Sequence, residues 1–166
     1  TSVFSFCMCP GGMVVLATSE EGRVVTNGMS FSLRHGPLAN AGMVAAIRAG
    51  DTGSDLFSGL VFQEAIESKA FDMGGRYCAP AQKVVDFLAG RKSAILPKTT
   101  YLPGVTSADL RMLYPDRLIR QIEKGLGYFS TKLLGLSGDE ALLIAPETRT
   151  SSPLRTIPDA TVPEKP

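Results

Sequence analysis

Three cysteines and a single histidine are the residues of this sequence best suited to metal or redox chemistry. Cys7 and Cys9 would point to the same face of an extended segment, because alternate side chains of a strand point alike. Together with Cys78 and His35 they could form a Cys3His zinc site, although Cys-x-Cys lacks the loop geometry of Cys-x-x-Cys. Buried, inert cysteines are the favoured interpretation, so we predict no metal site, and a redox-active thiol is a third hypothesis. His35 lies in a Gly-Pro loop, which favours exposure over acid-base catalysis.

A polar run from Glu147 to Arg155 is the second candidate for chemistry. It contains two arginines and four hydroxyl side chains, which can hold a phosphate or a carboxylate through charge-assisted hydrogen bonds. A linker or turn between two domains is the alternative, and residue chemistry alone favours it. The segment 27–30, Asn-Gly-Met-Ser, with Arg34 and Asn40, allows the same two interpretations: turn residues or ligand contacts.

Several motifs of nucleotide and hydrolase chemistry are absent from the sequence. It contains no G-x-G-x-x-G, whose glycines let a helix N-terminus approach a pyrophosphate, and no G-x-x-x-x-G-K-[ST] phosphate loop. It also lacks the G-x-S-x-G of many hydrolases. We therefore expect no tight FAD binding by this chain alone.

Short apolar and β-branched runs at the start of the chain predict strands. These runs cover 3–9, 13–17 and 23–26, and we expect the Pro-Gly-Gly at 10–12 to be a turn between the first two. A loop at 33–40 and a further strand at 43–48 would complete a unit of about four strands. The run at 141–145 is again strand-like, and we expect it to join this β unit.

Helical spacing dominates the middle of the sequence. Phe62, Ile66, Ala70 and Met73 recur at intervals of four and three, which predicts a helix that ends at Gly74-Gly75. A second helix is expected after Pro80, ending at Gly90. A third, longer helix is predicted by apolar residues at the same intervals, with a capping-box-like start at Thr106 and Asp109. Its apolar stripe consists of Leu118, Ile122, Leu126, Phe129 and Leu133.

Strands followed by helices and a final strand indicate an α+β fold, with a small, mostly antiparallel sheet or barrel-like unit and about three helices. We predict a β subdomain formed by 1–54 and 139–155, and a helical subdomain at 55–138. Residues 156–166 are rich in proline and small polar residues, which predicts an exposed, flexible tail.

The overall composition excludes several classes of protein. Seventeen basic and 16 acidic residues give a net charge of +1, which leaves no field to attract nucleic acid. Apolar stretches are far shorter than the ~20 residues that span a bilayer. We expect a soluble, cytoplasmic protein. The chain starts at Thr1 and enters an apolar run at once, which suggests a piece of a longer protein.

Four segments, taken in order, resemble the uncharacterised FAD-dependent dehydrogenases of bacteria, a family of NAD(P)/FAD-dependent oxidoreductases. They are Phe-Cys-Met-Cys-Pro-Gly-Gly at 6–12, Val-Thr-Asn-Gly-Met-Ser at 25–30, Ala-Pro-Ala-Gln at 79–82 followed by Asp-Phe-Leu at 86–88, and Glu-Thr-Arg-Thr-Ser-Ser-Pro at 147–153. The resemblance covers nearly the whole chain. It implies an inserted cap domain that shapes a substrate cavity, with FAD held by sequence on both sides.

The resemblance also implies roles for particular residues. Those expected to contact the cofactor at the junction with the FAD-binding domain are Cys9, Gly11, Gly12, Arg149, Ser151 and Arg155. Those expected to contact the substrate are Asn27, Met29, Arg34 and Asn40. Catalytic residues and the substrate are left unassigned. The isolated chain would be inactive, because the hydride-accepting ring belongs to FAD.

Two partners follow from this interpretation: the flanking FAD-binding domain of the same polypeptide, and a second copy of the chain packed against the exposed junction. A different hypothesis is a stand-alone interaction module without catalytic activity, whose long helix and Arg-rich loop bind another protein. Continuous coding sequence on both sides of the chain favours the first hypothesis, and a start codon directly before Thr1 favours the second.

Overall fold

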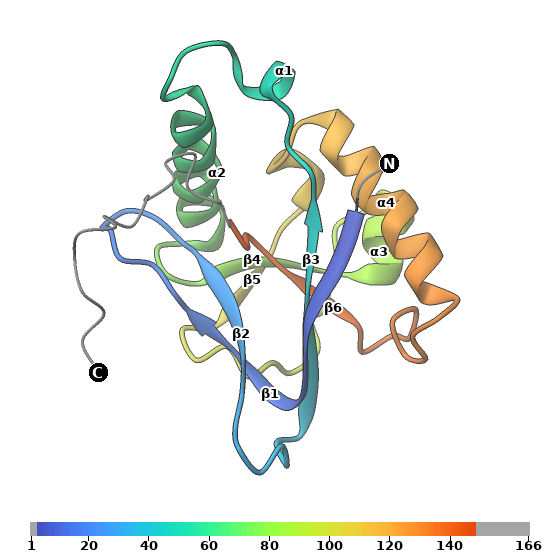
Figure 1. Cartoon of the computed structure of the whole chain (residues 1–166). Coiled ribbons are helices and arrows are strands. Elements are labelled where there is room, and N and C mark those ends of the chain that lie inside the picture. Colours follow the sequence, from blue (N-terminus) through green and yellow to red (C-terminus); the bar gives the residue numbers. More distant parts are fainter. Residues whose placement is uncertain (1–2, 149–166) are drawn as a thin grey trace, which may run out of the picture.

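Two three-stranded sheets and four α-helices make up the computed structural model, which describes residues 3–148 (Figure 1). The strands are β1 (Val3–Leu16), β2 (Thr26–Ser30), β3 (Leu38–Ala45), β4 (Ala79–Lys83), β5 (Val105–Ser107) and β6 (Leu142–Ile144). The helices are α1 (Ala49–Thr52), α2 (Ser58–Gly74), α3 (Val84–Leu88), the 3-10 helix η1 (Leu110–Met112) and α4 (Asp116–Ser130). The predicted α+β class is confirmed, and the sheets of this region do not close into a barrel.

The first sheet is antiparallel, with strand order β2-β1-β3, and its central strand is bent. We expected a turn at 10–12, but β1 runs through these residues as one strand. The pairing of β1 with β3 shifts register between Phe6 and Cys9, and again between Cys9 and Gly12. Gly11 adopts a φ of +59° there, which only glycine adopts readily, and Pro10 falls in the irregular stretch where its missing N–H costs little.

The start of β3 also differs from the expectation. We predicted a loop at 33–40 and a strand at 43–48, whereas β3 begins at Leu38 and ends at Ala45. Pro37 comes directly before the first strand residue, where a missing N–H removes no ladder bond. The loop between β2 and β3 therefore covers only residues 31–37.

Helix α2 confirms the predicted spacing and the predicted end. Ile66 and Ala70 are buried on one face, and Gly75 ends the helix in the left-handed conformation with a φ of +80°. A Cβ atom placed on Gly74 would lie 3.3 Å from atoms of Ala79 and Pro80. Glycine at this position therefore lets the last turn of α2 pack closely against β4.

The second sheet has the order β5-β4-β6, with β4 parallel to β5 and antiparallel to β6. We did not predict β4 from the sequence, and Pro80 is an unusual residue for a central strand. The residues on either side of Pro80 form the hydrogen bonds to neighbouring segments: the N–H of Ala79 donates to the Gly104 carbonyl, and the Ala81 carbonyl accepts from the N–H of Ala108. The prediction that 141–145 joins the N-terminal sheet was wrong, because β6 pairs with β4 instead.

Helix α4 begins later than the sequence pattern suggested. Thr106 lies in β5, and the Asp109 side chain accepts a hydrogen bond from the Arg111 N–H, so it caps η1 instead. Pro115 precedes the first turn of α4, since proline fixes a suitable backbone angle and needs no helical partner for its nitrogen. The helix ends at Ser130, before Leu133.

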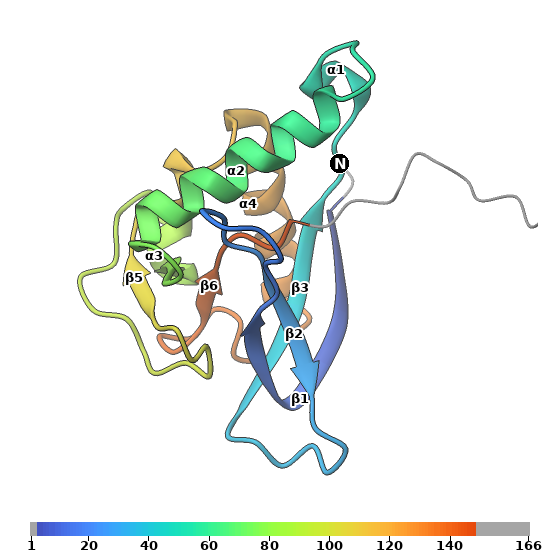
Figure 2. The ribbon, with the colours of Figure 1, turned by 90° about the vertical axis from the view of Figure 1, so that its left-hand side faces the viewer.

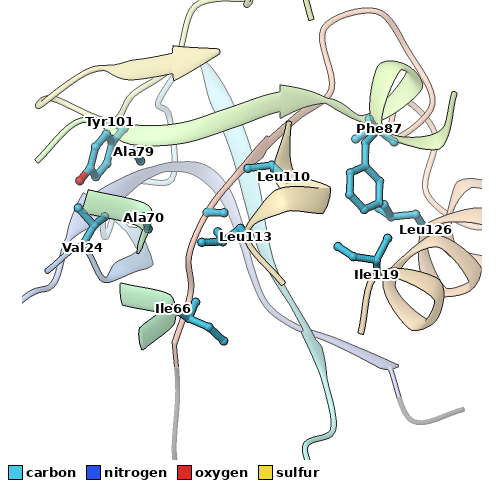
Figure 3. Packing of buried hydrophobic residues seen from close by; sticks show 12 residues of the cluster. Val24, Ile66, Ala70, Ala79, Phe87, Tyr101, Leu110, Leu113, Ile119 and Leu126 are labelled. Atoms are coloured by element: carbon cyan, nitrogen blue, oxygen red, sulfur yellow. The ribbon is translucent and has the colours of Figure 1, made fainter. Parts of the chain in front are cut away.

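One hydrophobic core joins both sheets and the helices (Figure 3). At one end, Val24 and Tyr101 pack around Ala70 of α2, and at the other the Phe87 ring of α3 points toward Leu126 of α4. The boundaries of the two predicted subdomains stay a prediction, although the segment 55–138 contains β4 and β5 as well as helices. Among residues 3–148, no helix combines the length and the apolar character needed to cross a membrane.

The Asp86 carboxylate joins α3 to the loop that follows it. It accepts hydrogen bonds from the Ser93 hydroxyl at 2.7 Å and from Arg91 Nε at 2.6 Å. These contacts, Ser93 first and Arg91 second, hold the pKa of Asp86 below its usual value. The carboxylate is nearly buried, with 8% of the residue exposed, so the loop depends on its charged form.

We expect Asp86→Asn to lower the stability of the chain at neutral pH and to lose this effect in acid. Because the folded-state pKa is depressed, the stabilisation is fully present above the unfolded value of about 3.9 and is lost as pH falls through the folded value. Urea unfolding of both proteins between pH 7 and pH 2 measures the difference. A difference that stays constant throughout would contradict this account.

Candidate functional site on the bent β arm

The bent part of the first sheet projects beyond the helices (Figure 2). We call residues 7–14 and 27–41 the arm. It comprises the bend of β1, most of β2, the 31–37 loop and the start of β3. Seven of the ten residues with predicted binding roles lie in the arm, and the other three, at 149, 151 and 155, lie outside the described residues. The arm is therefore the candidate functional site within the described residues.

Backbone-to-backbone packing holds the tip of the arm. The N–H of Gly36 donates to the Gly11 carbonyl oxygen at 3.1 Å. A Cβ atom placed on Gly11 would lie 2.1 Å from the Arg34 carbonyl oxygen, and one on Gly36 would lie 2.5 Å from the Gly11 oxygen. Both positions thus require glycine, because the 31–37 loop lies directly on the bend of β1.

Four residues meet in the middle of the arm, and three of them have predicted binding roles. Cys9 of β1 is the register partner of Asn40 of β3. A Cβ atom on Gly12 would lie 3.0 Å from Asn40 Nδ2, and one on Gly28 would lie 2.2 Å from Asn40 Oδ1 and 3.9 Å from Cys9 Sγ. The two glycines therefore make the space in which the Asn40 side chain lies.

The Asn40 amide is the unusual polar group of this cluster. Both its Oδ1 and its Nδ2 are shielded from solvent, and neither forms a hydrogen bond with any group of residues 3–148. Leaving a buried polar group unpaired costs about 1–3 kcal/mol. The amide can both donate and accept, and both capacities are unused within residues 3–148.

Large apolar side chains are exposed on the arm. Five of them lie on the arm and are more than 40% exposed: Met8, Met29, Phe31, Leu33 and Leu38. Single exposed apolar residues are normal, but five on one short projecting element indicate a contact surface. We refer to these five residues as the apolar surface of the arm.

The remaining predicted residues are distributed along the arm without forming one pocket. Asn27 is exposed, and its side chain accepts a hydrogen bond from the Gly28 N–H at 2.8 Å. Arg34 is exposed at the tip with a φ of +49°. Arg149, Ser151 and Arg155 lie outside the described residues.

The cysteines are divided between two places. Cys7 and Cys9 belong to the arm, with Cys7 exposed, and the Cys78 thiol donates to the Pro103 carbonyl oxygen at 3.0 Å. His35 is exposed in the arm loop. Within the described part of the chain, no three His, Cys, Asp or Glu side chains are grouped closely enough to hold a metal ion.

The last described residues, 145–148, form a strap that returns to the first sheet. The N–H and the hydroxyl of Thr26 both donate to the Pro146 carbonyl oxygen. Glu147 lies beside the Phe6–Gly42 pair, since a Cβ on Gly42 would be 2.8 Å from Glu147 Oε2. Burial, together with the Glu147 charge, raises the pKa of Tyr114. The strap therefore ends next to the strand with which the described region begins.

Two features of the site were missed from sequence. The apolar surface was not predicted, although Met8, Phe31 and Leu33 are large apolar residues in turn-rich segments, where burial is uncommon. Glu67, a carboxylate on α2 with only 4% exposure, was also missed. The signal for it was a Gln63–Glu67 pair at the i,i+4 spacing, which places the two on one helix face.

Comparison with known proteins adds a family to this geometry. The chain is 42% identical over 157 residues to an uncharacterised protein of Clostridium beijerinckii. The match covers 92% of the chain but 30% of the relative, so the chain spans less than a third of that protein's length. Residues 1–150 match the model of a family described as FAD-dependent protein, C-terminal domain-like. The chain belongs to this family of domains from FAD-dependent proteins.

Proposed function

We propose that the chain is the cap domain of an FAD-dependent oxidoreductase, with FAD held by other parts of a longer polypeptide. Membership of an FAD-dependent family supports the cofactor, and the relative's additional length leaves room for a separate FAD-binding part. In this proposal the arm packs against that part and forms one wall of the substrate cavity.

The proposal depends mainly on groups of the arm that lack a partner within the described residues. Five large apolar side chains are exposed on it, and the shielded Asn40 amide lacks a partner within residues 3–148. Exposed apolar side chains are unfavourable in an isolated domain and become favourable when another surface covers them, and an unpaired polar group beside them marks a region built for more than its own stability. They occur where the sequence predicted cofactor and substrate contacts, at Cys9, Gly12, Met29 and Asn40.

The closeness of the strap to β1 is consistent with an inserted domain. The strap lies beside the Phe6–Gly42 pair, three residues after the start of β1. An inserted domain is connected to its host fold by two chain segments, one entering and one leaving, and its two ends commonly lie close together. The FAD-binding part would then lie on the side of the sheet where these two connecting segments leave the domain.

The described residues fit the role of a cap better than that of a dinucleotide cradle. The parallel strands β4 and β5 are the pair that resembles a nucleotide-binding unit, but β4 continues directly into α3 with no glycine between them. A pyrophosphate needs a Gly-rich turn before a helix. When bound by the longer polypeptide, FAD would supply hydride transfer, while the arm would orient ligand groups and exclude water.

We expect the longer polypeptide to purify with about one FAD per chain, and the 166-residue chain to purify without stoichiometric flavin. Leu33→Ser in the longer polypeptide should lower the FAD content, because a polar group replaces an apolar contact at the tip of the arm. The matched control is Leu102→Ser, since Leu102 is 86% exposed but lies between α3 and β5. Flavin absorbance per protein measures the result.

The same preparations test the reaction class. Bound flavin that loses its visible absorbance with a chemical reductant and recovers it in air is competent for redox chemistry. Stoichiometric FAD on the 166-residue chain would refute the division into two parts. Equal flavin content in the Leu33 and Leu102 variants would show that the arm does not face the FAD-binding part.

A further inference from the structure

A second polar site lies away from the tip of the arm. A cavity of about 230 Å³ is bounded by the connection between β1 and β2, by α2, and by the end of the strap. The polar residues on which the argument depends are Thr18, Glu20, Arg23, Gln63, Glu67 and Thr148. Its volume is below the roughly 300–1,000 Å³ of cavities for drug-sized ligands, so only a small ligand or one head group fits.

Glu67 is the buried charge of this cavity. It is 4% exposed, and its carboxylate accepts hydrogen bonds from Gln63 Nε2, at 2.8 Å, and from the Thr148 hydroxyl. Both bonds end on Oε1, and Oε2 accepts none from residues 3–148. Half of the carboxylate's capacity as an acceptor is therefore unused.

No neighbour within residues 3–148 forms an ion pair with Glu67. Arg23, the cation on the cavity wall, is paired with Glu20 at 2.6 Å and with Glu64 at 3.0 Å. Because a buried carboxylate is costly without a cation, residues 3–148 leave the cavity one positive charge short.

We propose that this cavity binds a small organic cation, an ammonium or guanidinium group that donates hydrogen bonds to Glu67 Oε2. The hydroxyl of Thr18 and the side-chain amide of Gln63 provide further acceptors on the wall. A planar guanidinium suits such a set, because it presents several N–H donors to carboxylate and carbonyl oxygens at once. This inference does not depend on the proposed flavin chemistry.

The test is an NMR titration of the 166-residue chain with methylguanidinium and with methylurea, its neutral analogue of the same shape. Methylguanidinium should shift the backbone amide signals of Gln63, Glu67 and Thr148 saturably. Methylurea should bind at least tenfold more weakly, because it lacks the charge. Equal affinities for the two compounds, or no saturable shift with methylguanidinium, would overturn the proposal.

Three variants complete the test. Glu67→Gln keeps an oxygen that can accept from Gln63 and Thr148, and it should abolish the preference for the cation. Glu21→Gln makes the same charge change at an exposed residue outside the cavity and should bind like the parent chain. Leu60→Trp fills the cavity mouth without altering any charge and should also prevent binding. Unchanged cation preference in Glu67→Gln would refute the assigned role.

Discussion

Replacing Phe87 with alanine is expected to lower the free energy of unfolding by about 3–5 kcal/mol. The side chain is 1% exposed and packs against α4, where Ile119 and Leu126 are also buried (Figure 3). The Arg111 guanidinium lies 5.5 Å from the ring centroid, and a cation over an aromatic face adds attraction. Truncation removes the burial of the ring and leaves a cavity that the neighbouring helices cannot fill completely.

Urea unfolding followed by circular dichroism measures this loss. Leu88→Ala is the matched control, because Leu88 is the next residue of the same short helix and is 39% exposed. We expect the control to lose about 1 kcal/mol or less. Similar losses in the two variants would mean that the effect arises from helix propensity in α3 and not from the core.

Replacing Gly11 with alanine is expected to lower the free energy of unfolding by about 2–5 kcal/mol. A residue with a Cβ pays about 1–2 kcal/mol for a left-handed backbone, and Gly11 has a φ of +59°. The new methyl group would also lie 2.1 Å from the Arg34 carbonyl oxygen, an overlap that typically costs a further 1–3 kcal/mol. The backbone of the loop must move, because the group it meets is not a flexible side chain.

Gly22→Ala separates the cost of the left-handed backbone from the cost of the steric overlap. Gly22 has a φ of +75°, but no atom lies within 4 Å of a Cβ placed there, so it pays only the backbone cost. Urea unfolding should therefore place Gly11→Ala below Gly22→Ala in stability. NMR shifts of the 31–37 loop should change in the Gly11 variant alone. If both variants were equally stable, the packing of the loop on the bend would be refuted.

The same substitution connects stability to the proposed function. Gly11→Ala displaces the loop that carries Phe31 and Leu33, two residues of the apolar surface. In the longer polypeptide it should therefore reduce the FAD content, as Leu33→Ser does. If the Gly11→Ala variant kept its full FAD content, the FAD-binding part would have to contact this domain at a surface other than the arm.

Helix α2 is the element that the amino-acid sequence determined most completely. Apolar residues at 62, 66, 70 and 73 share one face because helical geometry brings residues three and four apart together. Gly74 and Gly75 end the helix through backbone freedom that belongs to glycine itself. Both signals are local, so the sequence was sufficient to predict the α+β class and this helix.

The strands illustrate what local patterns leave open. Pro80 argues against a central strand, yet Ala79 and Ala81 provide the ladder bonds of β4. The composition of the β6 segment predicts a strand, but it does not indicate which of the two sheets that strand joins. Its partner was decided by packing against β4, which is some sixty residues earlier in the chain, and composition contains no information about that choice.

The sites depend on contacts between distant segments. In the sequence, the resemblance to a known family made Cys9 and Gly12 candidate cofactor contacts, and the 27–30 segment with Asn40 was a candidate for turn or ligand contacts. Only the tertiary structure decided that Asn40 lies between Gly12 and Gly28, and that Thr148 bonds to Glu67 across 81 residues. The physical reason is that a hydrogen bond or a close approach depends on position in space, which is set by the folding of all the intervening chain.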